Sequence, residues 1–318
     1  MIWLLKLYAR LVIRIYCRRV IINKPRYLRS NGPLLLAANH PNSFLDGIIL
    51  TTLFDQPLRS LARGDAFRHP LLNKFLRRLN LLPVYRTSEG VHNLGHNYTT
   101  FDACHDSFDQ GGIVLIFSEG WCENEWHLRP LKKGTARLAT TAWQNGVPLR
   151  VLPVGINYSS FKWFGKTVHI NFGDIISYRR FDPGVSEGRL LVDFNDHLKG
   201  ELEKLVYELD ANNQGAIGRV FKKRRSFLAN ALLALPALIG WVLHAIFYYP
   251  IKFFCDYRFE RSGHYDSVLH SLLVLLYPVF LVLFFLVILP SGVKAALITT
   301  ALMPFFAWAW VQFSEIWE

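Results

Sequence analysis

The sequence lacks the closely spaced cysteines of a disulfide framework or a zinc site. Its four cysteines are scattered and form no CxxC pair; they are Cys17, Cys104, Cys122 and Cys255. It also has no internal repeat and no low-complexity tract, which argues against a repeat architecture. We therefore expect free thiols and a reducing compartment for the main domain.

Acidic residues are scarce relative to basic ones. The chain has 36 Lys and Arg against 24 Asp and Glu, a formal net charge of +12, and 51% of its 318 residues are hydrophobic. It has no zinc-finger spacing and no RNA-binding aromatic motif, so we expect no nucleic-acid partner. A chain both basic and apolar is typical of contact with anionic membrane lipids.

The N-terminus lacks the uninterrupted apolar core and cleavage site of a signal peptide. Basic residues recur at every fourth position (Lys6, Arg10, Arg14 and Arg18), and aromatic residues accompany them. On a helix this interval gives a basic stripe. We expect residues 1–29 to form an amphipathic helix in the membrane interface, with its arginines toward lipid phosphates. The alternative is a helix packed on the core.

Residues 30–215 alternate apolar runs with helical patterns, which predicts an α/β domain with a mostly parallel sheet flanked by helices. The expected strands are 33–38, 57–62, 82–85, 113–117, 150–156 and 166–172. The expected helices are 43–54, 70–80, 95–109, 131–145 and 187–210.

Residues 216–318 form a predicted membrane region. Apolar stretches at about 227–249, 267–289 and 293–313 are each long enough to span a bilayer, although the first could be re-entrant or interfacial. The basic run Lys222–Arg225 predicts that the α/β domain faces the cytoplasm.

The segment Asn39–Asp46, which follows a buried apolar run, is the most informative. A histidine can take a proton from an alcohol near neutral pH, and a carboxylate can stabilise the cation that forms. On one helix, residues six positions apart would point in different directions. His40 must therefore precede a helix and Asp46 must lie in its first turns if they cooperate. Alternatively, Ser43 and Asp46 form a capping box that serves only the helix.

Later segments add candidate anion-binding groups. Arg63 and Arg86 lie near the ends of expected strands, where a guanidinium can grip phosphate, although either could be a solvated loop residue. Glu119 and Gly120 follow the strand Ile113–Phe117. We expect Glu119 to bind substrate hydroxyls or a basic partner, or else to fix its loop.

Lys132 stands at the start of an expected helix, whose free N–H groups favour anions. His92 and His96 share a helix face, but no third ligand follows at a recognisable spacing, so we expect no metal.

Four sequence blocks, in the order in which they occur along the chain, resemble the glycerophospholipid acyltransferase family. This family comprises the lysophosphatidate and glycerol-3-phosphate acyltransferases. The blocks are His40-x5-Asp46, PVYR at Pro83–Arg86, FSEG with LKKG, and LPVGINY at Leu152–Tyr158. The resemblance implies an α/β domain that transfers a fatty acyl group from acyl-CoA or acyl carrier protein to a glycerol-derived hydroxyl, without a further cofactor. It implies His40 as general base and Asp46 as its partner. Asn39, Arg63, Arg86, Glu119, Gly120 and Lys132 would shape the substrate site.

The sequence departs from the family pattern at three points. Five residues separate His40 from Asp46 where four are usual, a spacing similar to that of fungal glycerol-3-phosphate and dihydroxyacetone-phosphate acyltransferases. Ser118 stands where proline is common, and Trp121-Cys122 where threonine-arginine is common. Arg86, Arg63 or Lys132 would then replace the missing phosphate-binding arginine.

Two other functions remain open: acylation of a different polar lipid, such as an amino-acid lipid, and a catalytically silent scaffold or transport module. The intact His40 and Asp46 argue against silence, and the few polar residues in the apolar stretches argue against transport. The sequence does not predict an oligomeric state. No nucleophilic serine or cysteine is expected, because neither Ser43 nor Cys122 has an identifiable base of its own.

Overall fold

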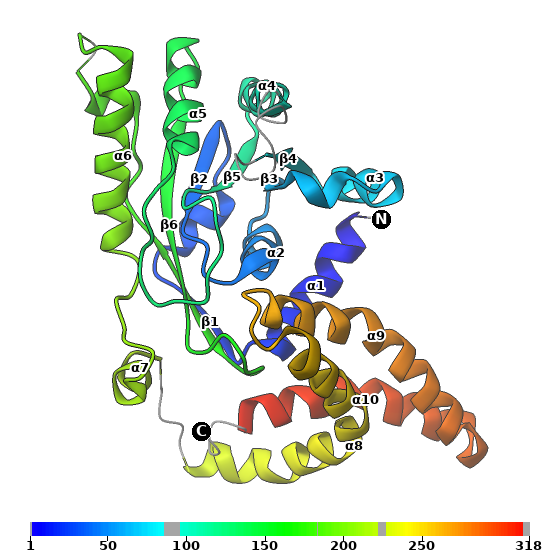
Figure 1. Ribbon diagram of the computed structural model, residues 1–318. Coiled ribbons are helices and arrows are strands. Elements are labelled where there is room, and N and C mark those ends of the chain that lie inside the picture. Colours follow the sequence, from blue (N-terminus) through cyan, green and yellow to red (C-terminus); the bar gives the residue numbers. More distant parts are fainter. Residues whose placement is uncertain (1, 86–95, 183, 222–226, 314–318) are drawn as a thin grey trace.

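The computed structural model describes residues 2–85, 96–182, 184–221 and 227–313 (Figure 1). Its centre is a seven-stranded sheet in the order β1-β7-β6-β2-β5-β3-β4. The strands are β1 (Arg19–Ile22), β2 (Leu34–Ala38), β3 (Leu58–Arg63), β4 (Leu81–Val84), β5 (Ile113–Phe117), β6 (Arg150–Tyr158) and β7 (Thr167–Phe172). Neighbouring strands are parallel except for the antiparallel pair β6–β7. The predicted mostly parallel sheet is confirmed.

Helices cover both faces of the sheet, which is why β2 contains no polar residue. Leu34 and Leu36 pack toward α2 (Ser43–Leu53) and α1 (Ile2–Tyr16). Leu35 packs toward the opposite face, covered by three helices that Figure 1 shows together on that side. These are α4 (His96–Asp109), α5 (Lys133–Gln144) and α6 (Glu187–Glu203). The apolar runs predicted from the sequence are thus the buried centre of three layers.

Three smaller elements complete the α/β part. Helix α3 (Pro70–Arg78) follows β3, and α7 (Gln214–Phe221) follows α6. The 3-10 turns η1 (Pro25–Arg29), η2 (Gly64–Phe67) and η5 (Tyr178–Arg180) lie in connections.

The N-terminal segment differs from the single interfacial helix expected over residues 1–29. Helix α1 ends at Tyr16, and Arg19–Ile22 form an edge strand that pairs with β7. Four residues directly after an apolar helix are too few to show a period of two, so this strand had no clear sequence signal.

Two residues of the basic stripe of α1, Lys6 and Arg10, contact the protein itself. The amine of Lys6 binds the carbonyl oxygens of Phe54 and Asp55, and Arg10 Nε donates to the carbonyl of Thr52 at 2.8 Å. Cations favour the carbonyl end of a helix, so these two residues stabilise the end of α2. Four leucines of α1 are exposed: Leu4, Leu5, Leu7 and Leu11.

Among the described residues, three helices are long and apolar enough to cross a membrane: α8 (Phe227–Phe259), α9 (Tyr265–Ile288, continued by η6 to Ser291) and α10 (Val293–Phe313). Much of their large apolar surface is exposed, and they lie together at one end of the molecule (Figure 1). The basic run Lys222–Arg225 lies outside the described residues.

Helix α8 extends ten residues beyond the predicted end of its apolar stretch. Charged residues of this extension fall at helical spacing. Lys252 Nζ lies 2.6 Å from Asp256, and Asp256 also accepts a hydrogen bond from Tyr265. An i,i+4 ion pair stabilises a helix.

Candidate active site

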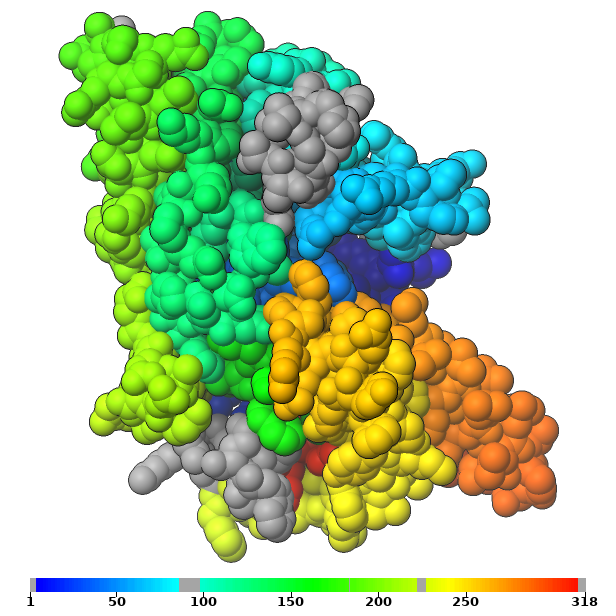
Figure 2. All heavy atoms as spheres, in the orientation of Figure 1, coloured from blue at the N-terminus to red at the C-terminus, as the bar shows by residue number. Residues whose placement is uncertain are grey.

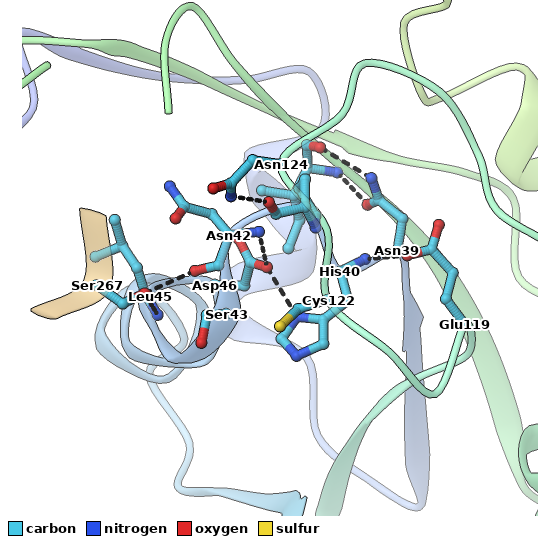
Figure 3. Close-up of polar contacts among 12 residues, drawn as sticks. Asn39, His40, Asn42, Ser43, Leu45, Asp46, Glu119, Cys122, Asn124 and Ser267 are labelled. Atoms are coloured by element: carbon cyan, nitrogen blue, oxygen red, sulfur yellow. Dashed lines mark hydrogen bonds and ion pairs between the residues drawn. The ribbon is translucent and has the colours of Figure 1, made fainter. Parts of the chain in front are cut away.

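The candidate site forms where β2 ends and α2 begins. His40 follows β2 in the connecting loop, and Asp46 is the fourth residue of α2. Their side chains meet, with His40 Nδ1 2.9 Å from Asp46 Oδ2 (Figure 3). The placement required by the six-residue spacing is confirmed: histidine before the helix and aspartate in its first turns.

The turn between His40 and Asp46 contains a left-handed backbone at Ser43. Ser43 has φ 50°, a conformation that non-glycine residues rarely adopt and that costs of order 1–3 kcal/mol. Its hydroxyl shares a 2.6 Å hydrogen bond with His264 Nδ1, next to the start of α9. The turn is therefore held by a residue from the C-terminal helices.

Asp46 is fully buried and all its described contacts stabilise a negative charge. Oδ2 accepts a hydrogen bond from the Asn42 backbone N–H at 2.8 Å as well as facing His40, and Oδ1 accepts from the Tyr158 hydroxyl at 2.7 Å. Beside this carboxylate the Nδ1 of His40 carries the proton, so Nε2 presents its lone pair. The ring is partly exposed, with 15% of the side-chain surface accessible.

The alternative of a capping box formed by Ser43 and Asp46 is correct in part. Asp46 stabilises the start of α2, but Ser43 is not the N-cap residue. The N-cap residue is Asn42, and Asp46 accepts the N–H of that residue. The carboxylate thus closes the first turn of α2 and faces the imidazole at the same time.

The orientation of His40 is fixed from two sides. Its ring stacks on Phe117 at the end of β5, with centroids 3.8 Å apart and planes 10° from parallel. Its backbone N–H donates to Glu119 Oε2 at 2.9 Å. These contacts fix the direction in which the Nε2 atom of His40 points.

Glu119 joins two loops rather than facing open space. Its second oxygen accepts the backbone N–H of Arg129 at 3.0 Å, and the residue is 4% exposed. Burial raises the pKa of Glu119 from its ordinary 4.5 to about 7, although both backbone hydrogen bonds lower it. These contacts favour the alternative in which Glu119 fixes its loop.

A Glu119→Gln substitution should lower stability by about 1–3 kcal/mol, because the amide NH₂ would face one of the two backbone donors. In the parent the folded state holds the Glu119 proton more tightly than the unfolded state. The free energy of unfolding therefore falls as pH rises from about 4.5 to about 7. Thermal unfolding across this range should show a shallower fall in the variant. Identical slopes would contradict the role of this carboxyl.

Two other predicted site residues, Asn39 and Arg63, have partners within the protein. The side chain of Asn39 is 2% exposed and pairs with the Ile156 backbone, accepting from its N–H at 2.7 Å and donating to its carbonyl at 3.0 Å. Its amide therefore extends the β2–β6 pairing. Arg63 binds Asp65 through a fork, with Nε 3.1 Å from Oδ1.

Gly120 and Lys132 lie side by side. Gly120 has φ 65°, and a Cβ there would lie 2.9 Å from Lys132 Cγ. Lys132 is exposed and precedes α5, and its amine has no ion-pair partner among the residues that the structure describes. It is thus available to an anion. Arg86 and His92 lie outside the described residues.

Sequence reasoning missed a cap for α2 that comes from α9. Ser267 Oγ accepts the N–H of Leu45 at 3.0 Å and donates to the carbonyl of Asn42 at 2.8 Å. An N-cap side chain normally binds the third N–H of a helix, and Asn42 makes no such bond. Ser267 supplies it from 222 positions away. No local pattern in the sequence could reveal this contact.

A buried charge pair lies under the same turn. Lys166 and Asp266 form an ion pair with both side chains fully buried. Asp266 also accepts hydrogen bonds from the Tyr16 hydroxyl and the Asn42 side chain. This network joins α1, β7 and α9 to the loop that carries His40.

The structure corrects one expectation about nucleophiles. Ser43 has a histidine at hydrogen-bond distance, His264, and Cys122 Sγ lies 3.9 Å from the same nitrogen. Figure 2 shows the loop after β5 and the segment before α9 adjacent on one face. Ser43 itself is buried, at 5% exposure.

The part of the chain around this pair matches a known protein family model. Residues 19–157 match the family model described as "Acyltransferase". No curated protein matches the chain. Among solved structures it is similar to the 1-acyl-sn-glycerophosphate (LPA) acyltransferase PlsC from Thermotoga maritima, at 17% identity and a TM-score of 0.45. That match covers 70% of this chain and 81% of the other. The segment that matches the acyltransferase family model thus includes both His40 and Asp46.

Proposed function

We propose that the protein is a membrane-bound O-acyltransferase that acylates glycerol-3-phosphate or 1-acylglycerol-3-phosphate in phospholipid synthesis. The observation that carries the proposal is the His40–Asp46 pair, with Nδ1 bound and the ring partly exposed, inside a segment that matches the acyltransferase family. The alternative of a silent scaffold offers no reason for a buried carboxylate that orients an accessible imidazole.

In the proposed reaction, His40 Nε2 takes the proton of the acceptor hydroxyl as its oxygen attacks the thioester carbonyl. The buried Asp46 stabilises the imidazolium. The tetrahedral intermediate collapses, the C–S bond breaks, and His40 returns the proton to the leaving thiolate. The acyl donor is acyl-CoA or acyl carrier protein. No acyl-enzyme is needed, so neither Ser43 nor Cys122 forms a covalent bond.

The phosphate of the acceptor needs cations at the edge where β2, β3 and β5 end. Lys132 is exposed next to Gly120, and Arg63 lies at the end of β3, partly neutralised by Asp65. We propose that Lys132 and Arg63, together with Arg86, hold this phosphate. Asn39, Glu119 and Gly120 act by shaping the loops around it.

The membrane helices suit a lipid substrate, because the start of α9 contacts the turn that carries His40. Acyl chains could then remain in the bilayer while the ester forms. By the positive-inside rule we propose that the α/β domain faces the cytoplasm.

The acceptor is tested with purified membranes, a labelled acyl donor and a panel of acceptors. We expect labelled product with glycerol-3-phosphate or its 1-acyl ester and little with the same alcohols lacking phosphate. A Lys132→Gln variant should raise KM for the phosphorylated acceptor by about tenfold, the effect of losing one charge-assisted contact. Labelling of an amino-acid lipid alone would show that the acceptor class is wrong.

A further inference from the structure

A recess lies near the C-terminal end of α2, the end opposite to Asp46. It has a volume of about 900 Å³ and lies between α1, β1, η1 and the C-terminal end of α2, with Trp308 of α10 completing its wall. No residue of the segment from His40 to Asp46 and none of the loop from Ser118 to Lys132 lines it. The recess is therefore separate from the proposed reaction centre.

The lining has a large excess of positive charge. Among the residues that the structure describes, six arginines and one carboxylate, Asp55, line it; the arginines are Arg10, Arg14, Arg18, Arg19, Arg26 and Arg29. Arg18 and Arg19 have other interactions, so the charge argument rests on the remaining four. Asp55 is shared, since Arg10 lies 3.4 Å and Arg29 3.9 Å from its oxygens. One carboxylate cannot neutralise four guanidinium groups, and concentrated like charge attracts an anion.

Two of these arginines remain available to a ligand. Arg14 and Arg26 are exposed, and neither has an ion-pair partner within the part of the chain that the structure describes. Arg26 lies over the ring of Tyr27, 5.2 Å from the centroid, which leaves the edge of its guanidinium open. Such an edge presents a fork of donors that matches phosphate oxygens.

The rest of the lining is apolar and leads to a candidate membrane helix. Ile13, Val20, Leu28 and Leu53 line the recess with Trp308, which belongs to α10. The neighbouring α1 exposes Leu4, Leu7 and Leu11, which are 61%, 51% and 50% accessible. A free inorganic anion would use the arginines but not these surfaces. A ligand with a charged head and hydrocarbon chains would use both.

We propose that this recess binds an anionic phospholipid. Its phosphodiester lies among the guanidinium groups, and its chains run along Trp308 and the exposed leucines of α1. Basic pockets beside membrane helices have this chemistry. The lipid would be a bound structural component, held at the junction of the α/β domain with α10, and the site does not depend on the acceptor proposed above.

Lipid binding is tested on the full-length protein, purified and delipidated in a non-ionic detergent. Short-chain phosphatidylglycerol, short-chain phosphatidylcholine and inorganic phosphate are added separately. Native mass spectrometry measures retained ligand, and thermal unfolding provides a second readout. We expect phosphatidylglycerol to be retained and to raise the unfolding temperature, and the other two to do neither.

The assignment to this recess is tested with Arg14→Gln/Arg26→Gln. Loss of two charge-assisted contacts should weaken phosphatidylglycerol binding by about tenfold or more. The matched control is Arg179→Gln/Arg180→Gln, which removes two exposed charges of η5 outside the lining. Equal binding to both variants would overturn the site. Equal retention of phosphatidylcholine would overturn the anionic class, and an equal effect of inorganic phosphate would overturn the lipid. Acyl transfer is not needed for any readout.

Discussion

Replacing His40 with alanine should lower kcat for acyl transfer by about 10²–10⁴-fold, the usual contribution of a general base. The structure gives this residue one orientation, set by Asp46 and by stacking on Phe117. Removing the imidazole leaves Asp46 with its contacts from Asn42 and Tyr158, so the fold should survive. The measurement is transfer of a labelled acyl group in membranes with matched protein amounts.

The control for this substitution is His197→Ala on α6, which should leave kcat within a few fold. Asp46→Asn tests the second member of the pair. The asparagine retains the shape but can present a donor to the ring, so Nε2 would no longer be held as the acceptor. We expect a loss of kcat similar to that of His40→Ala. Full activity of either variant would remove the acid–base assignment.

The second large effect concerns the buried pair of Lys166 and Asp266. Asp266→Asn should destabilise the protein by about 3–5 kcal/mol, because it leaves the Lys166 ammonium buried without its counter-charge. Asn42 and Tyr16 would also lose a charged acceptor. Activity should fall as well, since Asn42 binds Asp266 through its side chain and donates its backbone N–H to Asp46. Thermal unfolding in detergent and acyl transfer are measured together.

A double variant separates charge burial from simple misfolding. Lys166→Met combined with Asp266→Asn removes both charges and should recover most of the lost stability. The surface pair Arg189–Asp193 on α6 provides the comparison, since Asp193→Asn should cost less than about 1 kcal/mol. A double variant no more stable than Asp266→Asn would argue against the pair as the cause.

Most of the sheet could be predicted from the sequence because its strands are buried on both faces. The runs from Leu34 to Ala38 and from Ile113 to Phe117 have no polar residue, and their limits match the predicted strands closely. The edge strand Arg19–Ile22 lacks such a signal, as it is short and only partly covered. The end of α6 was predicted seven residues late, because no glycine or proline marks the stop at Glu203.

The candidate site was predictable only where its contacts are local in sequence. The meeting of His40 and Asp46 follows from their spacing and from helix geometry. The contacts of Ser267, Lys166 and His264 do not, because each joins residues at least 100 positions apart. Asn39 precedes His40 and Glu119 binds its backbone N–H, but the backbone partners of both side chains depend on how the loops fold.

Because Ser267 caps α2, the first turn of this helix depends on a segment that is synthesised late. The ribosome makes Leu45 and Asn42 early and Ser267 more than 200 residues later. Until then the first turn of α2 has a donor without this acceptor, and Lys166 awaits its counter-charge. The turn that positions His40 is therefore completed only when the chain has emerged as far as α9. A nascent fragment ending before that point would carry the motif and the sheet but an unfinished reaction centre.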